Sequence, residues 1–175
     1  MLHPEISMRS DLRARFLREG YVANKVAHPG AVRVFDDDIA DDGSAFLVMD
    51  LLTGETVDRR LRRCGGILGC REALALGYQL LDVLEAAHAV GIVHRDLKPA
   101  NVFLTRRRDG TDFIKLLDFG IVRPEDSEMT NTGATLGTPH YMSPEQAAGQ
   151  TVDQRTDIYS LGVIMYEMVT GKVPF

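Results

Sequence analysis

Nine consecutive residues, 94–102, read His-Arg-Asp-Leu-Lys-Pro-Ala-Asn-Val and bring together four side chains that can act on a phosphate ester. These side chains are Arg95, Asp96, Lys98 and Asn101. Asp96 can accept a proton from an attacking hydroxyl, and Lys98 can neutralise a phosphoryl group as a point charge. Charged residues seldom gather at the mouth of an apolar core without a task. The segment therefore predicts a phosphate-handling loop.

A further acidic residue, Asp118, comes directly after the apolar segment 113–117. Carboxylate and amide oxygens are hard ligands suited to Mg2+, which usually takes one or two protein carboxylates together with phosphates of the substrate. Asp118 and Asn101 are therefore the candidate metal ligands. With Asp96 they supply the positioning and charge neutralisation that phosphoryl transfer requires.

The elements that must position this loop are apolar on one face. Apolar residues recur every three or four positions through 71–90, which predicts a helix that stops at Gly91. Residues 102–104 and 113–117 are predicted to pair as strands, and 156–170 to form another helix. The loop is thus expected to lie between a helix and a strand pair.

The first part of the chain predicts a helix over 10–26 and strands at 31–35 and 45–50, joined by an acidic turn at 36–43. Glu19 falls on the apolar stripe of that helix. A carboxylate there needs a cationic partner or a hydrogen-bond donor, unless it lies at the solvated edge of the stripe. One helix and two strands do not make a stable half-domain, so further strands are expected.

The overall composition limits the function classes. The 175 residues suffice for one domain with a full core, and the net charge of −5, with both signs interleaved, does not favour a nucleic-acid surface. Cys64 and Cys70 fit neither a zinc knuckle nor a redox pair and are predicted to be free thiols. We find neither an apolar run long enough to span a bilayer nor a signal peptide in the sequence, so we expect a cytoplasmic location, with a membrane anchor elsewhere in the full-length protein left open.

Three blocks resemble the signature motifs of protein kinases in order and spacing. They are 94–101 (His-Arg-Asp-Leu-Lys-Pro-Ala-Asn), 118–120 (Asp-Phe-Gly) and 143–145 (Ser-Pro-Glu). The segments 137–147 and 157–162 resemble the bacterial eukaryotic-like (Hanks-type) serine/threonine kinases in particular. The resemblance covers essentially the whole chain.

The resemblance implies an α+β, bilobal fold of the protein-kinase type. Residues 1–52 would form a partial small lobe, with helix C, about two strands and the hinge. Residues 53–175 would form a mainly helical, partial large lobe that is truncated after helix F. The family's glycine-rich loop and third-strand lysine have no counterpart before Glu19, so we expect Met1 to be an internal methionine of a longer protein.

The resemblance also implies roles for individual residues. Asp96 is expected to be the catalytic base, Lys98 to contact the γ-phosphate of ATP, and Asn101 and Asp118 to bind Mg2+. Five residues are expected around the nucleotide: Glu19, which would pair with the absent lysine, Met49 at the gatekeeper position, Asp50 and Leu52 at the hinge, and Phe103.

Other matching residues are expected to act on the loop itself. Thr138 would hydrogen-bond the catalytic loop, and Asp157 would brace the backbone around His94 and Arg95. Arg95 would bind a phosphate on the long segment 121–139, because Arg is a strong partner for phosphate. The acceptor candidates there are Thr130, Thr132 and Thr135.

The implied function is transfer of the ATP γ-phosphate to serine or threonine hydroxyls of proteins, with Mg2+ as cofactor and self-association for autophosphorylation between copies. One alternative is an inactive kinase-like remnant that binds a partner. Another, a small-molecule kinase of the aminoglycoside type, shares an Asp and Asn loop but does not need 137–138 or 143–145. Intact Asp96, Lys98, Asn101 and Asp118 favour the active protein kinase over a binding remnant.

Overall fold

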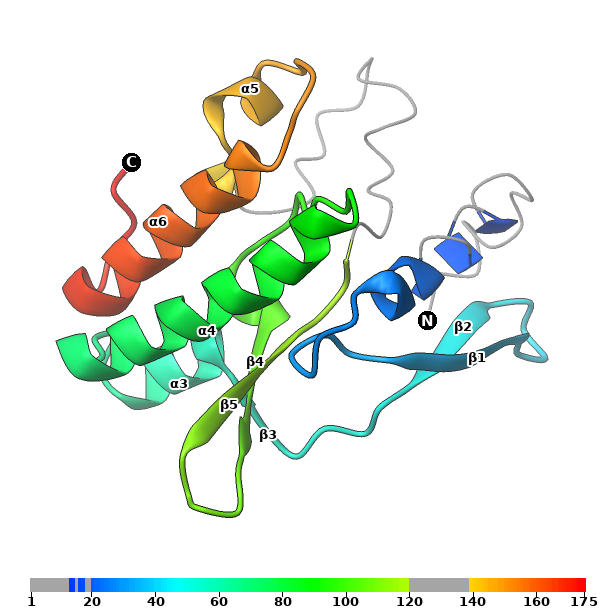
Figure 1. Cartoon of the computed structure of the whole chain (residues 1–175), viewed down its shortest axis with the longest axis horizontal. Helices are drawn as coiled ribbons and strands as arrows, with labels where there is room; N and C mark the ends of the chain where they lie inside the picture. Colours follow the sequence, from blue (N-terminus) through cyan, green and yellow to red (C-terminus); the bar gives the residue numbers. More distant parts are fainter. Residues whose placement is uncertain (1–12, 15, 18–19, 120–138) are drawn as a thin grey trace.

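The computed structural model describes residues 13–14, 16–17, 20–119 and 139–175. Figure 1 shows two neighbouring parts: a strand hairpin beside short helical segments, and a larger body built mainly of helices. A short linker after β2 (Ala45–Met49) joins them and leads into β3 (Gly54–Thr56). No helix in the described residues is long and apolar enough to cross a membrane.

The smaller part contains helical residues at 13–14, 16–17 and 20, the 3-10 segment η1 (Tyr21–Lys25), and the antiparallel strands β1 (Val34–Ile39) and β2. β1 differs from the prediction, because it starts later and runs through the acidic residues 36–38. The strand can continue there because residues 36–39 pair with 45–48, while Asp36 and Asp38 are exposed and Asp37 accepts a hydrogen bond from the Tyr21 hydroxyl (2.9 Å). The turn itself is confined to residues 40–43, where Gly43 has a positive φ of 82°.

The larger part contains a three-stranded antiparallel sheet in the order β3-β4-β5, in which β4 is Val102–Arg106 and β5 is Asp112–Leu116. The predicted pairing of 102–104 with 113–117 is confirmed, with Val102 opposite Leu116. β3 is not among the predicted strands. It leads directly into helix α3 (Val57–Arg63), whose N-cap Thr56 accepts a hydrogen bond from the amide of Arg59.

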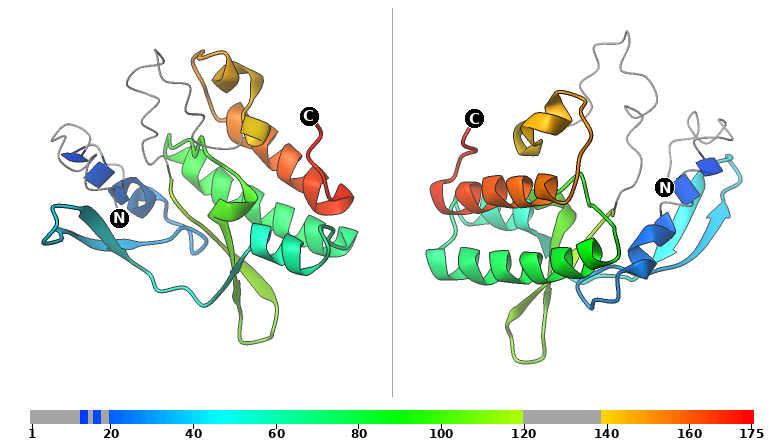
Figure 2. Two further views of the ribbon diagram at one scale, coloured as in Figure 1. Left: turned by 180° about the vertical axis from the view of Figure 1, so that it is seen from behind. Right: turned by 45° about the horizontal axis from the view of Figure 1, so that its top comes forward.

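Two long helices, α4 (Cys70–Ala89) and α6 (Arg155–Thr170), form the centre of the larger part. They lie side by side in Figures 1 and 2, and both confirm the helices predicted from apolar spacing. Leu80, Val83 and Ile164 are fully buried in the core that these helices share with the sheet. Each such side chain contributes roughly 1.5–3 kcal/mol of transfer free energy. The core thereby fixes the α4 end from which residues 90–98 emerge.

A buried arginine connects the elements around this core. Arg60 on α3 is only 8% exposed and donates to Glu55 on β3 (2.6 Å), Glu72 on α4 (2.7 Å) and Asp112 on β5 (3.0 Å). Burial lowers the pKa of Arg60, but the hydrogen bonds to the three carboxylates outweigh burial and raise it. Because every charge in the group is paired, one guanidinium joins four elements without an isolated buried ion.

The two parts meet at residues 28–31. The amide of Leu116 donates to the Gly30 carbonyl (2.7 Å), and Ala31 forms a parallel bridge with Leu116. His28 adds a side-chain contact, since its Nε2 lies 3.0 Å from Oδ2 of Asp82 on α4. Gly30 has no space for a larger residue, because an added Cβ would lie 2.3 Å from Val83. The smaller part is therefore attached close to the end of β5, just before Asp118.

Candidate active site

The predicted phosphate-handling loop leaves α4 at Gly91, whose φ of 75° reverses the chain. Ile92 and His94 turn into the core, with His94 fully buried. Arg95 is exposed, and its backbone has a positive φ of 66°, a conformation that costs a non-glycine residue about 1–3 kcal/mol. Such a backbone persists only where surrounding contacts fix it.

Asp157 on α6 provides some of the contacts that hold the Arg95 backbone in this conformation. Its two carboxylate oxygens accept hydrogen bonds from the backbone amides of His94 and Arg95, each at 2.9 Å. His88 Nε2 on α4 lies 2.8 Å from the same carboxylate, which is completely buried. The bracing expected of Asp157 is present in the structure. The sequence reasoning did not include His88, although its position one turn before Gly91 places it close to the loop.

His94 links the loop to the strand that ends at Asp118. Burial lowers the pKa of His94, which favours the neutral imidazole. In that form Nε2–H donates to the Leu117 carbonyl (2.8 Å), and Nδ1 accepts from the amide of Asp96 (3.3 Å). The ring also packs at 58° against Phe119, with centroids 5.2 Å apart. The imidazole thus joins the backbones of Asp96 and Leu117.

The predicted catalytic side chains come together after this histidine. Lys98 Nζ lies 2.8 Å from Oδ2 of Asp96, and Asn101 Nδ2 donates to the same oxygen (3.3 Å) and to the Asp96 carbonyl (2.8 Å). The 3-10 turn η2 (Pro99–Asn101) brings Asn101 back toward Asp96, and the Asn101 amide donates to the Lys98 carbonyl (2.9 Å). The sequence pattern placed these three residues close in the chain, and the turn makes their side chains converge.

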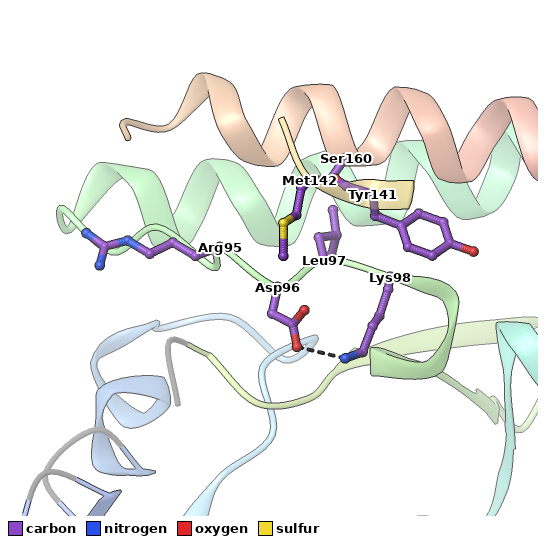
Figure 3. Close-up of a pocket in the computed structure, with 7 residues that line it drawn as sticks. All are labelled: Arg95, Asp96, Leu97, Lys98, Tyr141, Met142 and Ser160. Atoms are coloured by element: carbon purple, nitrogen blue, oxygen red, sulfur yellow. Dashed lines mark hydrogen bonds and ion pairs between the residues drawn. The ribbon is translucent and has the colours of Figure 1, made fainter. Parts of the chain in front are cut away.

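A small pocket opens beside Asp96 and Lys98, and Tyr141, Met142 and Ser160 form its other wall (Figure 3). Ser160 Oγ on α6 donates to the Tyr141 carbonyl (2.7 Å), which fixes this wall relative to α6. The Arg95 side chain points away from Asp96 in Figure 3. Arg95 itself lines the pocket, and its guanidinium group is directed away from the Asp96 carboxylate.

Asp118, the second candidate metal ligand, lies at the end of β5 and is exposed, with a positive φ of 56°. The amide of Leu117 donates to the Asn101 carbonyl (2.9 Å), so the segment carrying Asp118 is tied to the loop. Since Nδ2 of Asn101 is directed at Asp96, Oδ1 is the amide atom left for a cation.

The oxygens of Asn101 and Asp118 are of the type that Mg2+ prefers. In the described part of the chain, groups of three or more His, Cys, Asp or Glu that could hold a metal are absent. A set this small fits Mg2+, which completes its shell with water and substrate phosphates, better than it fits Zn2+.

A second, mainly apolar cavity is lined in part by Asp118. Met49, Leu47, Leu117 and Phe119 contribute to its walls. The gatekeeper candidate Met49 and the metal candidate Asp118 therefore line one cavity. Its lining residues do not include the three other nucleotide candidates that lie within the described ranges, Asp50, Leu52 and Phe103.

Those three candidates lie elsewhere in the same region. The Asp50 carboxylate accepts from the Arg33 amide (3.3 Å) and lies 3.8 Å from Nζ of Lys115. Leu52 and Phe103 are partly buried, the first on the linker and the second on β4. Five further predicted residues, Glu19, Thr130, Thr132, Thr135 and Thr138, lie outside the described residues.

One contact that the sequence did not suggest comes from the Ser-Pro-Glu block. Gln146, in the short helix α5 (Pro144–Ala147), donates from Nε2 to the carbonyl of Arg95 at 2.8 Å. The two residues are 51 positions apart, and no periodic pattern predicts such a pair. The only signal in the sequence was the capping-box spacing of Ser143 and Gln146, which concerns the helix end and not the loop.

The geometry and the comparisons agree on the class of protein. A strand hairpin attached to a helical body, with an Asp-Lys-Asn loop hydrogen-bonded to the segment that carries a strand-end aspartate, is the arrangement of the protein kinase fold. The chain belongs to the protein kinase domain family, whose model matches residues 3–175. The predicted α+β, bilobal kinase fold is thereby confirmed.

Relatives place the chain among bacterial serine/threonine kinases. It is 42% identical over 177 residues to the serine/threonine-protein kinase Pkn1 of Myxococcus xanthus, covering 100% of this chain and 25% of Pkn1. It is 43% identical over 176 residues to PkaA of Streptomyces coelicolor, covering 100% of this chain and 32% of PkaA. The chain thus spans a quarter to a third of these relatives.

A solved structure is similar as well. The crystal structure of the PknI kinase domain of Mycobacterium tuberculosis matches with a TM-score of 0.75 at 32% identity. The match covers 99% of this chain and 63% of the PknI chain. The resemblance to the bacterial Hanks-type kinases that the motifs suggested is confirmed.

Proposed function

We propose that this chain is the catalytic segment of a serine/threonine protein kinase that transfers the γ-phosphate of ATP to protein hydroxyls. The observation that carries the proposal is the convergence of Lys98 and Asn101 on the Asp96 carboxylate, at 2.8 and 3.3 Å, beside a solvent-accessible pocket. The named activity of the bacterial relatives supports the choice of serine and threonine as acceptors.

In the proposed reaction, Asp96 receives the proton of the substrate hydroxyl as that oxygen forms a bond to the γ-phosphorus. The bond between the γ-phosphorus and the oxygen bridging to the β-phosphate breaks, and ADP leaves. Lys98 neutralises charge on the transferred group. Its contact with Asp96 in the present structure keeps the two groups within reach of one reacting centre.

Mg2+, held by Asn101 and Asp118, would neutralise the phosphate charges and orient the nucleotide. We assign Glu19, Met49, Asp50, Leu52 and Phe103 to the nucleotide side of the site. The cavity shared by Met49 and Asp118 supports the assignment of Met49. Thr138 is assigned to a hydrogen bond with the loop.

The proposal includes a division at residue 52, with 1–52 in the small lobe and 53–175 in the large lobe. The linker before β3 supports this boundary. The reaction consumes ATP, so we place it in the cytoplasm, and a membrane anchor elsewhere in the full-length protein is compatible with this location. Regulation is assigned to Arg95 together with a phosphate on Thr130, Thr132 or Thr135, added by a second copy of the protein; the outward direction of the Arg95 side chain supports this role.

The test uses the full natural protein that carries this sequence, with ATP, Mg2+ and a peptide library offering Ser or Thr as the acceptor. Asp96→Asn removes the base with little change in shape, and kcat is expected to fall about 1,000-fold. Asp109→Asn, an exposed change of the same type in the β4–β5 turn, is the matched control. Equal transfer rates in wild type and Asp96→Asn would overturn the proposed function.

A further inference from the structure

The peptide group that joins Arg95 to Asp96 is hydrogen-bonded at both of its polar atoms. Its N–H, on Asp96, lies 3.3 Å from Nδ1 of His94. Its carbonyl, on Arg95, accepts from Nε2 of Gln146 at 2.8 Å. The orientation of this plane determines where the Asp96 side chain begins. Gln146 therefore acts directly on the backbone that carries the proposed base.

Gln146 is itself firmly anchored. Its Oε1 accepts from the amide of Ser143 (3.2 Å), and its own amide donates to Ser143 Oγ (3.4 Å), so the two residues form a capping box. With both its oxygen and its nitrogen engaged, the side-chain amide has one orientation. The donor is consequently directed at the Arg95 carbonyl.

The base of α5 is fixed to α6 in turn. Ser143 Oγ contacts Thr156 Oγ1, and both residues are completely buried. Thr156 Oγ1 also donates to Oε1 of Glu145 (3.1 Å). α6 also carries Asp157, which accepts from the His94 and Arg95 amides. Helix α6 thus holds the His94 and Arg95 amides directly through Asp157, and it holds the Arg95 carbonyl indirectly through Gln146.

We propose that Gln146 is a positioning residue for Asp96, acting through the Arg95 carbonyl. The positive φ of Arg95, 66°, is a conformation that surrounding contacts must maintain. Asp157 fixes the peptide before Arg95, and Gln146 together with His94 fixes the peptide after it. Without the Gln146 donor, the second peptide can rotate, and Asp96 loses its alignment with the acceptor hydroxyl. This inference rests on the proposed kinase function.

Two substitutions separate this role from a purely structural one. Gln146→Glu keeps an acceptor for the Ser143 amide, and Glu is a favoured residue at the third position of a capping box, but a carboxylate cannot donate to the Arg95 carbonyl. Gln146→Lys keeps a donor of similar reach and loses the acceptor. A helix-capping role predicts that the Glu variant is the better tolerated. A positioning role predicts the opposite order in kcat.

The experiment measures phosphotransfer by the full natural protein with these variants, using Gln150→Glu as the matched control. Gln150 is exposed on the same segment, so its substitution introduces the same charge without contact to Arg95. We expect Gln146→Glu to lower kcat about 10-fold, with KM for ATP and the thermal midpoint unchanged. Gln146→Lys is expected to retain most of kcat, and Gln150→Glu all of it.

Two results would overturn the inference. One is an unchanged kcat in Gln146→Glu, and the other is a larger loss in Gln146→Lys than in Gln146→Glu. Asp96→Asn, assayed in parallel, keeps the two proposals apart. If Asp96→Asn is inactive while Gln146→Glu is fully active, only the positioning role of Gln146 fails. If Asp96→Asn is fully active, the proposed function itself fails.

Discussion

Replacing Asp157 by Asn is expected to destabilise the loop at its base. In the wild type, Oδ1 accepts from the Arg95 amide (2.9 Å), and Oδ2 accepts from the His94 amide (2.9 Å) and lies 2.8 Å from His88. Asn has one oxygen and one NH2 group. Whichever way it turns, an NH2 group faces a backbone N–H, so the buried His94 amide or the partly buried Arg95 amide is left without an acceptor.

The magnitude follows from these contacts. A buried donor left unsatisfied costs about 1–3 kcal/mol, and hydrogen bonds to a neutral oxygen contribute about 1 kcal/mol less than those to a carboxylate. With one amide unsatisfied and another bonded to the neutral oxygen, the sum is about 3 kcal/mol. Because Asp157 is completely buried, solvent offers no substitute.

The assay is amide hydrogen exchange of wild type and Asp157→Asn in the full natural protein. A loss of about 3 kcal/mol corresponds to exchange about 100-fold faster at the His94 and Arg95 amides. Asp153→Asn is the matched control, since the Asp153–Arg155 ion pair is exposed and its loss should change stability by less than about 1 kcal/mol. Unchanged protection at His94 and Arg95 in Asp157→Asn would refute the bracing role.

Two other predictions concern acid stability and phosphorylation. Hydrogen bonds from Arg63 and Arg60 lower the pKa of Glu55 from 4.5 to about 2. The ionised Glu55 therefore contributes its full stabilisation of the folded state above pH 4.5, and this stabilisation is lost as the pH falls toward 2. Glu55→Gln should therefore be less stable than wild type at neutral pH, with a difference in unfolding free energy that narrows through that window; a constant difference would contradict this. Mass spectrometry of active protein is expected to find phosphate on Thr130, Thr132 or Thr135, and an unmodified segment would contradict the proposed regulation.

Local patterns predicted the elements with the strongest periodicity. The helices expected at 71–90 and 156–170 are present as Cys70–Ala89 and Arg155–Thr170. Both carry long apolar stripes that must be buried, so spacing alone located them. β3 was missed, because three residues, Gly54–Thr56, are too few to show an alternating pattern. Its place in the sheet depends on pairing with β4, which is distant in sequence.

The boundary of the acidic strand β1 could not be predicted from the sequence for a different reason. Residues 36–38 were read as a turn because Asp is disfavoured in strands. In the structure they pair with 46–48, and a strand with a solvated face tolerates charged side chains. Tertiary pairing, and not residue preference, therefore decided the boundary of β1.

The candidate site was predicted at the level of residue types and not of contacts. The residues 94–102 and Asp118 identified the loop and the strand end. Neither the complete burial of His94 nor the hydrogen bond from Gln146 to Arg95 follows from any local pattern. Both depend on how α4, α6 and the 139–149 segment pack together, which only the three-dimensional structure gives.

The central claim is that Asp96 serves the transfer step and not nucleotide binding. The most direct measurement is single-turnover transfer of γ-labelled phosphate by wild type and Asp96→Asn, combined with calorimetric titration of each with ATP and Mg2+. The account predicts that the transfer rate falls about 1,000-fold, while the dissociation constant for ATP stays within a factor of about three. A variant that transfers phosphate at the wild-type rate, or one that loses nucleotide binding together with transfer, would contradict it.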